Sequence, residues 1–391
     1  MKNAALPYEE EHNKDLVPFF INFVSRRKKN KNMKVYFKII FLFLVLSLWT
    51  GCSNDFTDKL APVQAAFGKI NELVLVADKS VWEGDIGDTI RYYLSSAYII
   101  LPQPEPILDI RYYEPKDLKS VSGRKNFRTY LFIGDLNDAD SPTTRMIKED
   151  IGSEGVYRAN EDPAFNLSVG NNKWSKDQIL IYQFAKDKTT LIDNIKKNAA
   201  TILKRVNRHD REVVNANIYQ GGENLTLISL VESRMGVELK IPYDYFLALD
   251  DSTATTIWIR KETDYLSSNI FLHKFPYKDQ EQLSKKGIKN QLNRMGLYVS
   301  TEIDGTYKHI NDVDLPIYTT NMQLDGKFAV ETRGIWEIEN DFMGGPYISY
   351  SILNPTTNEI LLVEGFIHAP SKNKRDYMQQ LEHIFGSLKF R

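Results

Sequence analysis

The only cysteine of the chain follows its most apolar segment, and together they divide the 391 residues into a leader and a body. Residues 39–49 read IIFLFLVLSLW, and Ser47 is their one polar residue. A membrane-spanning helix needs about 20 apolar residues, whereas a run this short is typical of the apolar region of a secretory signal peptide. Because Cys52 comes three residues after this run, we predict that residues 1–51 are a leader and that only the remainder folds.

The residues around Cys52 resemble a bacterial lipoprotein signal. A basic region from Arg26 to Lys38 precedes the apolar run, and the small residue Gly51 precedes the cysteine. In that family the leader is removed and the cysteine thiol is diacylated, so the resemblance implies a lipid on Cys52. Each buried methylene of such a lipid contributes about 0.8 kcal/mol to membrane binding. Trp49 departs from the usual pattern, which has an aliphatic residue there. The alternative is an ordinary buried cysteine after a core helix, which leaves the basic region unexplained.

Two further features of the leader bear on its processing. Met33 begins the sequence MKVYFK, which is an ordinary start for a signal peptide. We predict that translation starts there, and the alternative is an unusually long basic region. Ser53 follows the cysteine, where an Asp would resemble an inner-membrane retention signal. We therefore expect a body anchored to the outer membrane on its periplasmic face, with a surface-facing orientation as the alternative.

The composition of the body excludes several classes of protein. Residues 1–51 hold nine basic and four acidic residues, so the remaining 340 residues carry 41 basic and 47 acidic ones, a net charge of −6. This charge disfavours a nucleic-acid partner. The hydrophobic fraction of the whole chain, 42%, disfavours disorder, and one cysteine excludes an internal disulfide. The sequence contains no GxxxxGK[ST], GxGxxG, GxSxG or HExxH motif. We predict no cofactor, and we favour a non-enzymatic protein.

The pattern of apolar residues predicts a tether at 52–69, an α/β domain at 70–220 and an α+β domain at 223–391, with Gly221-Gly222 between the domains. In the first domain we predict strands at 71–77, 107–113, 128–133 and 178–185. Ser80, Ser141 and Thr189 begin its predicted helices. In the second domain we predict helices at 224–235, at 280–295 and after Ser371, and strands at 237–241, 246–249, 256–260, 269–275, 328–339, 347–353 and 359–368.

These elements predict a mixed α+β fold of two domains. The second domain should be an antiparallel sheet flanked by its opening and closing helices. That layout resembles the PsbP-like α-β-α sandwich of extracytoplasmic accessory proteins.

Acidic residues follow two predicted strands of the first domain. Asp78 follows the strand at 71–77, and Asp135, Asp138 and Asp140 follow the strand at 128–133. If the two strands are parallel neighbours, their carboxyl ends would gather four carboxylates. Oxygen ligands of this kind suit Mg²⁺ or Ca²⁺. The alternative is a solvated turn and the acidic start of a helix.

A second candidate site lies on the predicted strands of the second domain. The two-residue period of a strand places Glu337 with Glu339 on one face, and Glu364 with His368 on one face of a later strand. If the two faces coincide, these residues and Arg333 share a surface that could perform acid–base chemistry. The alternative is the solvated outer face of a half-buried sheet.

Several motifs spread over the body resemble a known family. They are Trp82-Glu83-Gly84, Leu101-Pro102-Gln103, Tyr130 to Leu136, Arg333-Gly334, Met343-Gly344-Gly345-Pro346, Glu364-Gly365-Phe366 and Ala369-Pro370. Together they resemble the uncharacterised bacterial lipoprotein family, domain-of-unknown-function family 4837, from about residue 70 to the end. The resemblance implies a lipoprotein and assigns no catalytic residue. We expect a lipid-anchored module that binds an envelope protein or another envelope component, and the alternative is an envelope hydrolase that uses the acidic or the Glu/His residues.

Overall fold

A computed structural model of the chain describes residues 63–253 and 255–391. The predicted leader, Met33, Cys52 and most of the predicted tether lie outside the described residues. Among the residues that are described, no helix combines the length and the apolar character that crossing a membrane requires.

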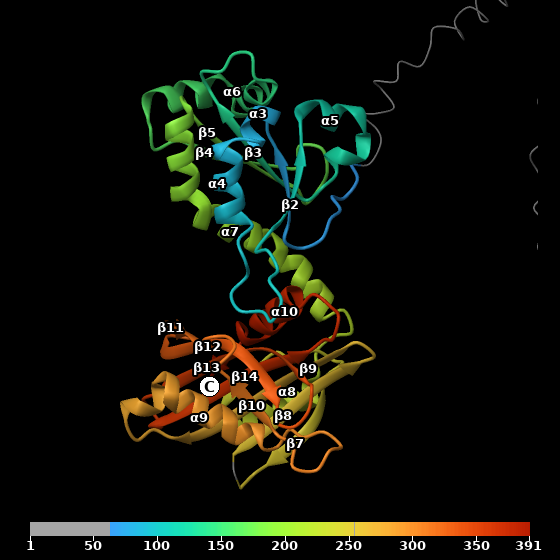
Figure 1. Ribbon diagram of the computed structural model, residues 1–391, viewed down its shortest axis with the longest axis vertical. Coiled ribbons are helices and arrows are strands. Elements are labelled where there is room, and N and C mark those ends of the chain that lie inside the picture. Colours follow the sequence, from blue (N-terminus) through green and yellow to red (C-terminus); the bar gives the residue numbers. More distant parts are fainter. Residues whose placement is uncertain (1–62, 254) are drawn as a thin grey trace, which may run out of the picture. The chain divides into compact units, whose positions relative to one another are not determined.

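The first domain is built around a five-stranded sheet (Figure 1). Its strands are β1 (Glu72–Val76), β2 (Asp109–Tyr113), β3 (Thr129–Asp135), β4 (Leu167–Asn171) and β5 (Ile179–Ala185). Its helices are α3 (Lys79–Trp82), α4 (Asp85–Leu94), α5 (Pro115–Ser120), the 3-10 helix η1 (Ser122–Lys125), α6 (Pro142–Glu161) and α7 (Lys188–Ile218). The strand order is β2-β1-β3-β5-β4, with β4 as the antiparallel edge strand.

Helices cover both faces of this sheet, as a parallel sheet requires. On one face, Ile90 of α4 and Ile195 of α7 pack against the strands. On the other face, Leu118 of α5 and Ile147 of α6 do the same. The central strands β1, β3 and β5 are therefore mostly apolar, as in the fully buried sequence YLFI of β3. The predicted α/β character of this half is confirmed.

The first helix of this domain differs from the prediction. Ser80 does not cap a helix to residue 97. Helix α3 instead begins after Asp78 and ends at Trp82, and a separate helix, α4, begins after Gly84. A Cβ atom on Gly87 would lie 1.8 Å from the carbonyl oxygen of Trp82. The two short helices therefore touch at Gly87, and a straight helix would lose this contact.

The second domain is built around an eight-stranded antiparallel sheet. Its strands are β7 (Phe246–Asp251), β8 (Thr256–Thr263), β9 (Leu266–Pro276), β10 (Lys308–Asn311), β11 (Tyr318–Leu324), β12 (Lys327–Ile338), β13 (Gly344–Asn354) and β14 (Glu359–His368). The helices are α8 (Leu225–Met235), the 3-10 helix η2 (Gln280–Leu283), α9 (Lys285–Gly296) and α10 (Arg375–Phe385). The strand order is β10-β12-β13-β14-β9-β8-β7, and β11 also pairs with β12. Two short strands, β6 (Val237–Glu238) and β15 (Lys389–Phe390), pair separately.

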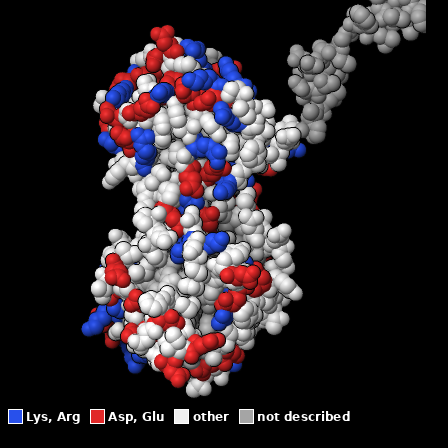
Figure 2. Space-filling view, turned by 45° about the vertical axis from the view of Figure 1, so that its right-hand side comes forward, with Lys and Arg blue, Asp and Glu red and all other residues white. Residues whose placement is uncertain are grey.

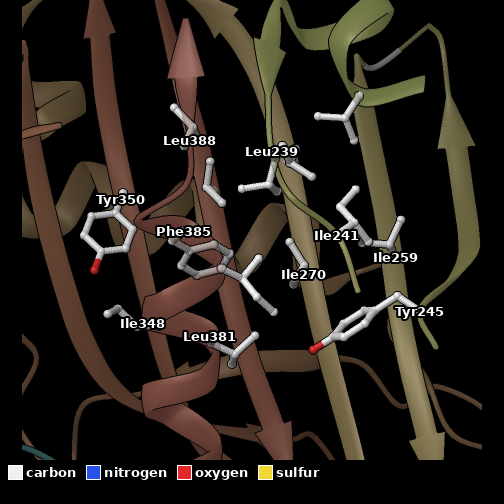
Figure 3. Packing of buried hydrophobic residues seen from close by; sticks show 14 of the residues in the cluster. Leu239, Ile241, Tyr245, Ile259, Ile270, Ile348, Tyr350, Leu381, Phe385 and Leu388 are labelled. Atoms are coloured by element: carbon white, nitrogen blue, oxygen red, sulfur yellow. The ribbon is translucent and has the colours of Figure 1, made fainter. Parts of the chain in front are cut away.

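Both faces of the eight-stranded sheet are covered. We call one the α10 face: there Leu381 and Phe385 of α10 pack on Ile348 and Tyr350 of β13 (Figure 3). Helix α8 contributes to the same cluster through Val231. We call the other the α9 face, where Ile288, Leu292 and Met295 of α9 pack on the strands. The predicted mixed α+β fold, with a helix-flanked antiparallel sheet in the second half, is confirmed.

The start of the last helix also differs from the prediction. Ser371 does not cap it, because Ser371 adopts a φ of 59° and α10 begins after Lys374. The cap comes instead from Glu105, in the proline-rich connector between α4 and β2. Its carboxylate accepts hydrogen bonds from the backbone N–H groups of Lys374, at 2.6 Å, and Arg375, at 3.1 Å. A side chain of the first domain thus completes a helix of the second.

Candidate functional site

A pocket of about 350 Å³ opens on the α9 face at one end of the eight-stranded sheet. At this end β8, β12 and β14 finish, and β9 and β13 begin. One wall is the segment Val299–Thr301, which follows α9, and another is the turn between β8 and β9. Pockets of this size are within the range that proteins use for small ligands.

Four aromatic side chains contribute to the pocket's apolar lining. Trp336 of β12 and Phe366 of β14 are buried and meet edge to face, with their ring centroids 5.2 Å apart. Trp258 of β8 lies at the side, and Tyr265 in the β8–β9 turn stands at the rim with 49% of its surface exposed. Aromatic rings contribute a large apolar contact area with few rotatable bonds. The pocket is therefore suited to hold an apolar or aromatic group.

The polar side chains of the pocket bond mainly to one another. Asn269 accepts from the indole N–H of Trp258 at 3.0 Å and donates to Ser267 at 2.9 Å. Ser267 in turn donates to Glu262, which also pairs with Arg260. These hydrogen bonds hold the ring of Trp258 in place. In the described part of the chain, the Nε of Arg260 in this network is buried without a hydrogen-bond partner.

His368, one of the residues predicted from sequence, lines this pocket. Its Nδ1 lies 3.1 Å from the carbonyl oxygen of Gly344. Because a carbonyl oxygen only accepts, the Nδ1–H group of His368 is the donor in this hydrogen bond. Gly345 lies beside it, where a Cβ atom would be 1.9 Å from the carbonyl oxygen of Ile367. Strands β13 and β14 therefore approach each other closely at this glycine.

The four predicted Arg, Glu and His residues do not share one surface. The register places Glu364 and His368 on the α9 face and Arg333 and Glu337 on the α10 side of the sheet. The two strand faces therefore do not coincide, and these residues do not form the common acid–base site that the sequence suggested. Even on one strand, Glu364 and His368 are four residues apart, which is about 13 Å and too far for direct proton transfer.

Glu364 is not on a solvated face either, because both it and Lys308 of β10 are fully buried. The Lys308 Nζ lies 2.5 Å from Oε1 of Glu364 and 4.7 Å from the centroid of the Phe366 ring. Burial raises the pKa of the Glu364 carboxyl, and the charge of Lys308 opposes this effect. Its second oxygen, Oε2, is buried without a hydrogen-bond partner. The pair is a structural feature of the core, and we return to its energy in the Discussion.

Arg333 belongs to a network that joins the two domains. It bonds to Glu331 and Glu382, and its Nη1 lies 3.1 Å from the hydroxyl of Tyr98, which comes from the first domain. Burial lowers the pKa of Arg333, but the carboxylates of Glu382 and Glu331 outweigh it and raise the pKa overall. Arg333 is thus a permanently charged structural residue.

Glu337 lies at the edge of the sheet beside His309. The His309 Nε2 is 3.3 Å from Glu337 and 3.2 Å from Glu339. Asn311 of β10 donates a further hydrogen bond to Glu337 at 2.9 Å. The sequence predicted that Glu337 and Glu339 lie together, but not that they share a histidine, because β10 was not predicted.

The acidic candidates of the first domain are used as local caps. Strands β1 and β3 are parallel neighbours, as the hypothesis required. Asp78, however, accepts hydrogen bonds from Ser141 and Thr143 at the start of α6. Asp135 accepts a hydrogen bond from a backbone N–H group of its own turn. Asp138 likewise accepts one from the backbone N–H group of Asp140. Within residues 63–253 and 255–391, no group of three or more His, Cys, Asp or Glu residues could hold a metal ion. The predicted metal cluster is therefore not formed.

Comparison with protein families separates the two halves of the chain. The model of the family "Domain of unknown function (DUF4837)" matches residues 224–387. The second half of the chain is a DUF4837 domain. The family predicted from the sequence motifs is thus confirmed for this half. Residues 66–219 match a different family, "Domain of unknown function (DUF8532)". The motifs before residue 220 that we assigned to the first family therefore fall in the second.

Comparison with individual proteins adds little. No curated protein matches the chain. Among solved structures, LpqN, "involved in cell envelope biogenesis of Mycobacterium tuberculosis", is 13% identical, with a TM-score of 0.24 over 39% of this chain and 82% of that one. The Ran-binding protein Mog1p of Saccharomyces cerevisiae is 10% identical, with a TM-score of 0.26 over 40% and 90% of the two chains. At these scores neither likeness supports a conclusion, and the PsbP-like layout stays a prediction.

Proposed function

We propose that this protein is a lipid-anchored component of the bacterial envelope whose DUF4837 domain binds an apolar group of another envelope molecule. The observation that carries the binding role is the aromatic pocket at the end of the eight-stranded sheet. Its rings come from three strands and a turn, and several of its polar side chains bond to one another. Such a pocket can discriminate by shape and apolar contact.

The lipid anchor is supported by the sequence around Cys52. The basic region, the short apolar run and Gly51 match the order of a lipoprotein signal, and Ser53 favours the outer membrane over the inner. The body is acidic overall, and Figure 2 shows acidic and basic side chains interspersed on the face in view. Attachment by the lipid suits such a body better than electrostatic adhesion to anionic membrane.

The anchor is tested by Cys52→Ala in the native host. We expect the wild-type protein to incorporate labelled palmitate and to fractionate with the outer membrane. The Cys52→Ala variant should lose the label and keep its leader, because processing in this family follows acylation. Ser53→Asp is the matched control and should remain labelled while moving to the inner membrane. Equal outer-membrane recovery of Cys52→Ala would refute the proposed anchor.

The pocket is tested with the mature body and the neutral apolar dye N-phenyl-1-naphthylamine, whose fluorescence rises in apolar surroundings. Ser300 lines the pocket and is exposed at its mouth. We expect Ser300→Trp to fill the mouth and weaken dye binding at least tenfold. Glu302→Trp adds the same ring to an exposed position two residues away, outside the lining, and should leave binding unchanged. Equal affinities for the wild type and Ser300→Trp would show that the pocket does not take up the dye.

A further inference from the structure

A second cavity, of about 580 Å³, lies in the first domain between α7 and the β4–β5 hairpin. Three arginines and a histidine line it: Arg128, which directly precedes β3, and Arg205, Arg208 and His209 of α7. Two carboxylates, Asp177 and Glu212, also line it. This basic groove is separate from the aromatic pocket, which belongs to the other domain.

The helical repeat explains why the α7 residues converge. Positions 205, 208, 209 and 212 are spaced i, i+3, i+4 and i+7, so they lie on one face of the helix. The buried side of α7, with Ile202 and Val206, holds this face next to the sheet. Arg205 and His209 are therefore half-buried beside the sheet, whereas Arg208 and Glu212 are exposed.

The basic groups of the groove have unused hydrogen-bond donors. Among the described residues, the Nε–H groups of Arg128 and Arg205 are buried donors without a hydrogen-bond partner. Arg128 is only 9% exposed, and its bonds to the His209 carbonyl and to Asp210 use Nη2 alone. In the described part of the chain, Arg205 and Arg208 form no ion pair within 4.0 Å. Leaving a buried donor of a charged group unpaired is energetically unfavourable.

This cost and the convergence of the three arginines indicate what the groove is suited to hold. We propose that it binds a phosphate group, either on a free phosphate ester or on a lipid headgroup. A single arginine can satisfy a planar carboxylate with two parallel bonds. The groove instead brings together three guanidinium groups, one from the residue before β3 and two from α7. Together they match the several oxygens of a tetrahedral phosphate. Burial and the charge of Arg128 lower the pKa of His209, which lines the groove beside these arginines.

The proposal is tested by titrating the mature body with inorganic phosphate at constant ionic strength and following backbone amide resonances. We expect saturable shifts in residues of the groove at millimolar phosphate. Arg205→Gln combined with Arg208→Gln should weaken this binding at least tenfold. Arg211→Gln is the matched control, because Arg211 is an exposed arginine of the same helix that does not line the groove. Should the double variant unfold, Arg208→Gln alone, at an exposed position, should still weaken binding several-fold.

Vesicles distinguish the two sources of the phosphate. Binding to phosphatidylglycerol vesicles that is lost in the double variant, and absent with phosphatidylcholine vesicles, would identify a lipid headgroup. Saturable binding of inorganic phosphate without vesicle binding would identify a free phosphate ester. If neither probe binds saturably, or if Arg211→Gln weakens binding as much as the double variant does, the proposal is wrong.

Discussion

Lys308→Met is expected to lower the free energy of unfolding by about 3–5 kcal/mol, because it leaves a carboxylate buried without its counter-ion. Lys308 and Glu364 are both fully buried, and the Nζ is the one hydrogen-bond partner that the structure gives the carboxylate of Glu364. Methionine fills nearly the same space as the lysine stem, so the loss would report the charge and not a cavity. Urea unfolding of the mature body measures it.

The partner substitution provides the control for this expectation. Lys308→Met combined with Glu364→Leu removes both charges and retains apolar volume, so it should recover most of the lost stability or exceed the wild type. The two substitutions should therefore be strongly non-additive in a double-mutant cycle. Additive losses would mean that the two side chains do not depend on each other in the folded protein.

The loss in Lys308→Met should also depend on pH. Burial raises the pKa of Glu364, and removing Lys308 removes the charge that opposes this effect. The folded variant then binds a proton more tightly than the unfolded chain, so its stability falls as the pH rises from about 4, the usual carboxyl range. We expect a smaller difference from the wild type at pH 4–5 than at pH 7–8. A difference that is constant over this range would contradict the burial of the charge.

Glu105→Ala is expected to cost about 2–4 kcal/mol, because it leaves the N–H groups of Lys374 and Arg375 buried without an acceptor. It also removes a negative charge from the N-terminus of α10. The same connector bonds to Arg375 through the carbonyl of Pro106 at 2.7 Å. The variant should therefore loosen the link between the domains at this helix.

Hydrogen exchange measures this effect locally. We expect the first turn of α10 to lose protection in Glu105→Ala, and Glu105→Gln to keep part of it through its remaining amide oxygen. Gln103→Ala, an exposed position in the same connector, should change nothing. Unchanged protection of α10 in Glu105→Ala would show that the helix does not need this cap.

Periodicity predicted most of the regular elements. The apolar stripe of α7 and the buried strands β1, β3 and β5 lie close to their expected ranges. The predictions that failed did so for more than one reason. Ser371 looked like a cap because the sequence does not reveal that Glu105, 269 residues away from Lys374, takes that role. Strands β10 and β11 were missed because edge strands carry a weak apolar pattern, as in the exposed residues of β11.

The candidate site was only partly accessible to sequence reasoning. His368 was identified, but its neighbours Trp258, Trp336 and Phe366 looked like ordinary core residues. They meet because the strand order brings β8, β12 and β14 to one end of one sheet. Face assignments within a strand follow from its period of two, whereas the coincidence of faces on different strands depends on register. That is why Glu364 and His368 share a face while Arg333 and Glu337 lie on the other.

The most direct test of the central claim is site-specific photo-cross-linking in native envelopes. A benzoylphenylalanine at position 265, on the exposed rim of the pocket, is compared with one at position 157, which is also an exposed tyrosine but lies on α6 of the first domain. We predict a product at position 265 that is absent at position 157 and is lost when Ser300→Trp or Cys52→Ala is added. The same products at both positions, or a product at 265 that survives Ser300→Trp, would contradict an anchored module that binds through this pocket.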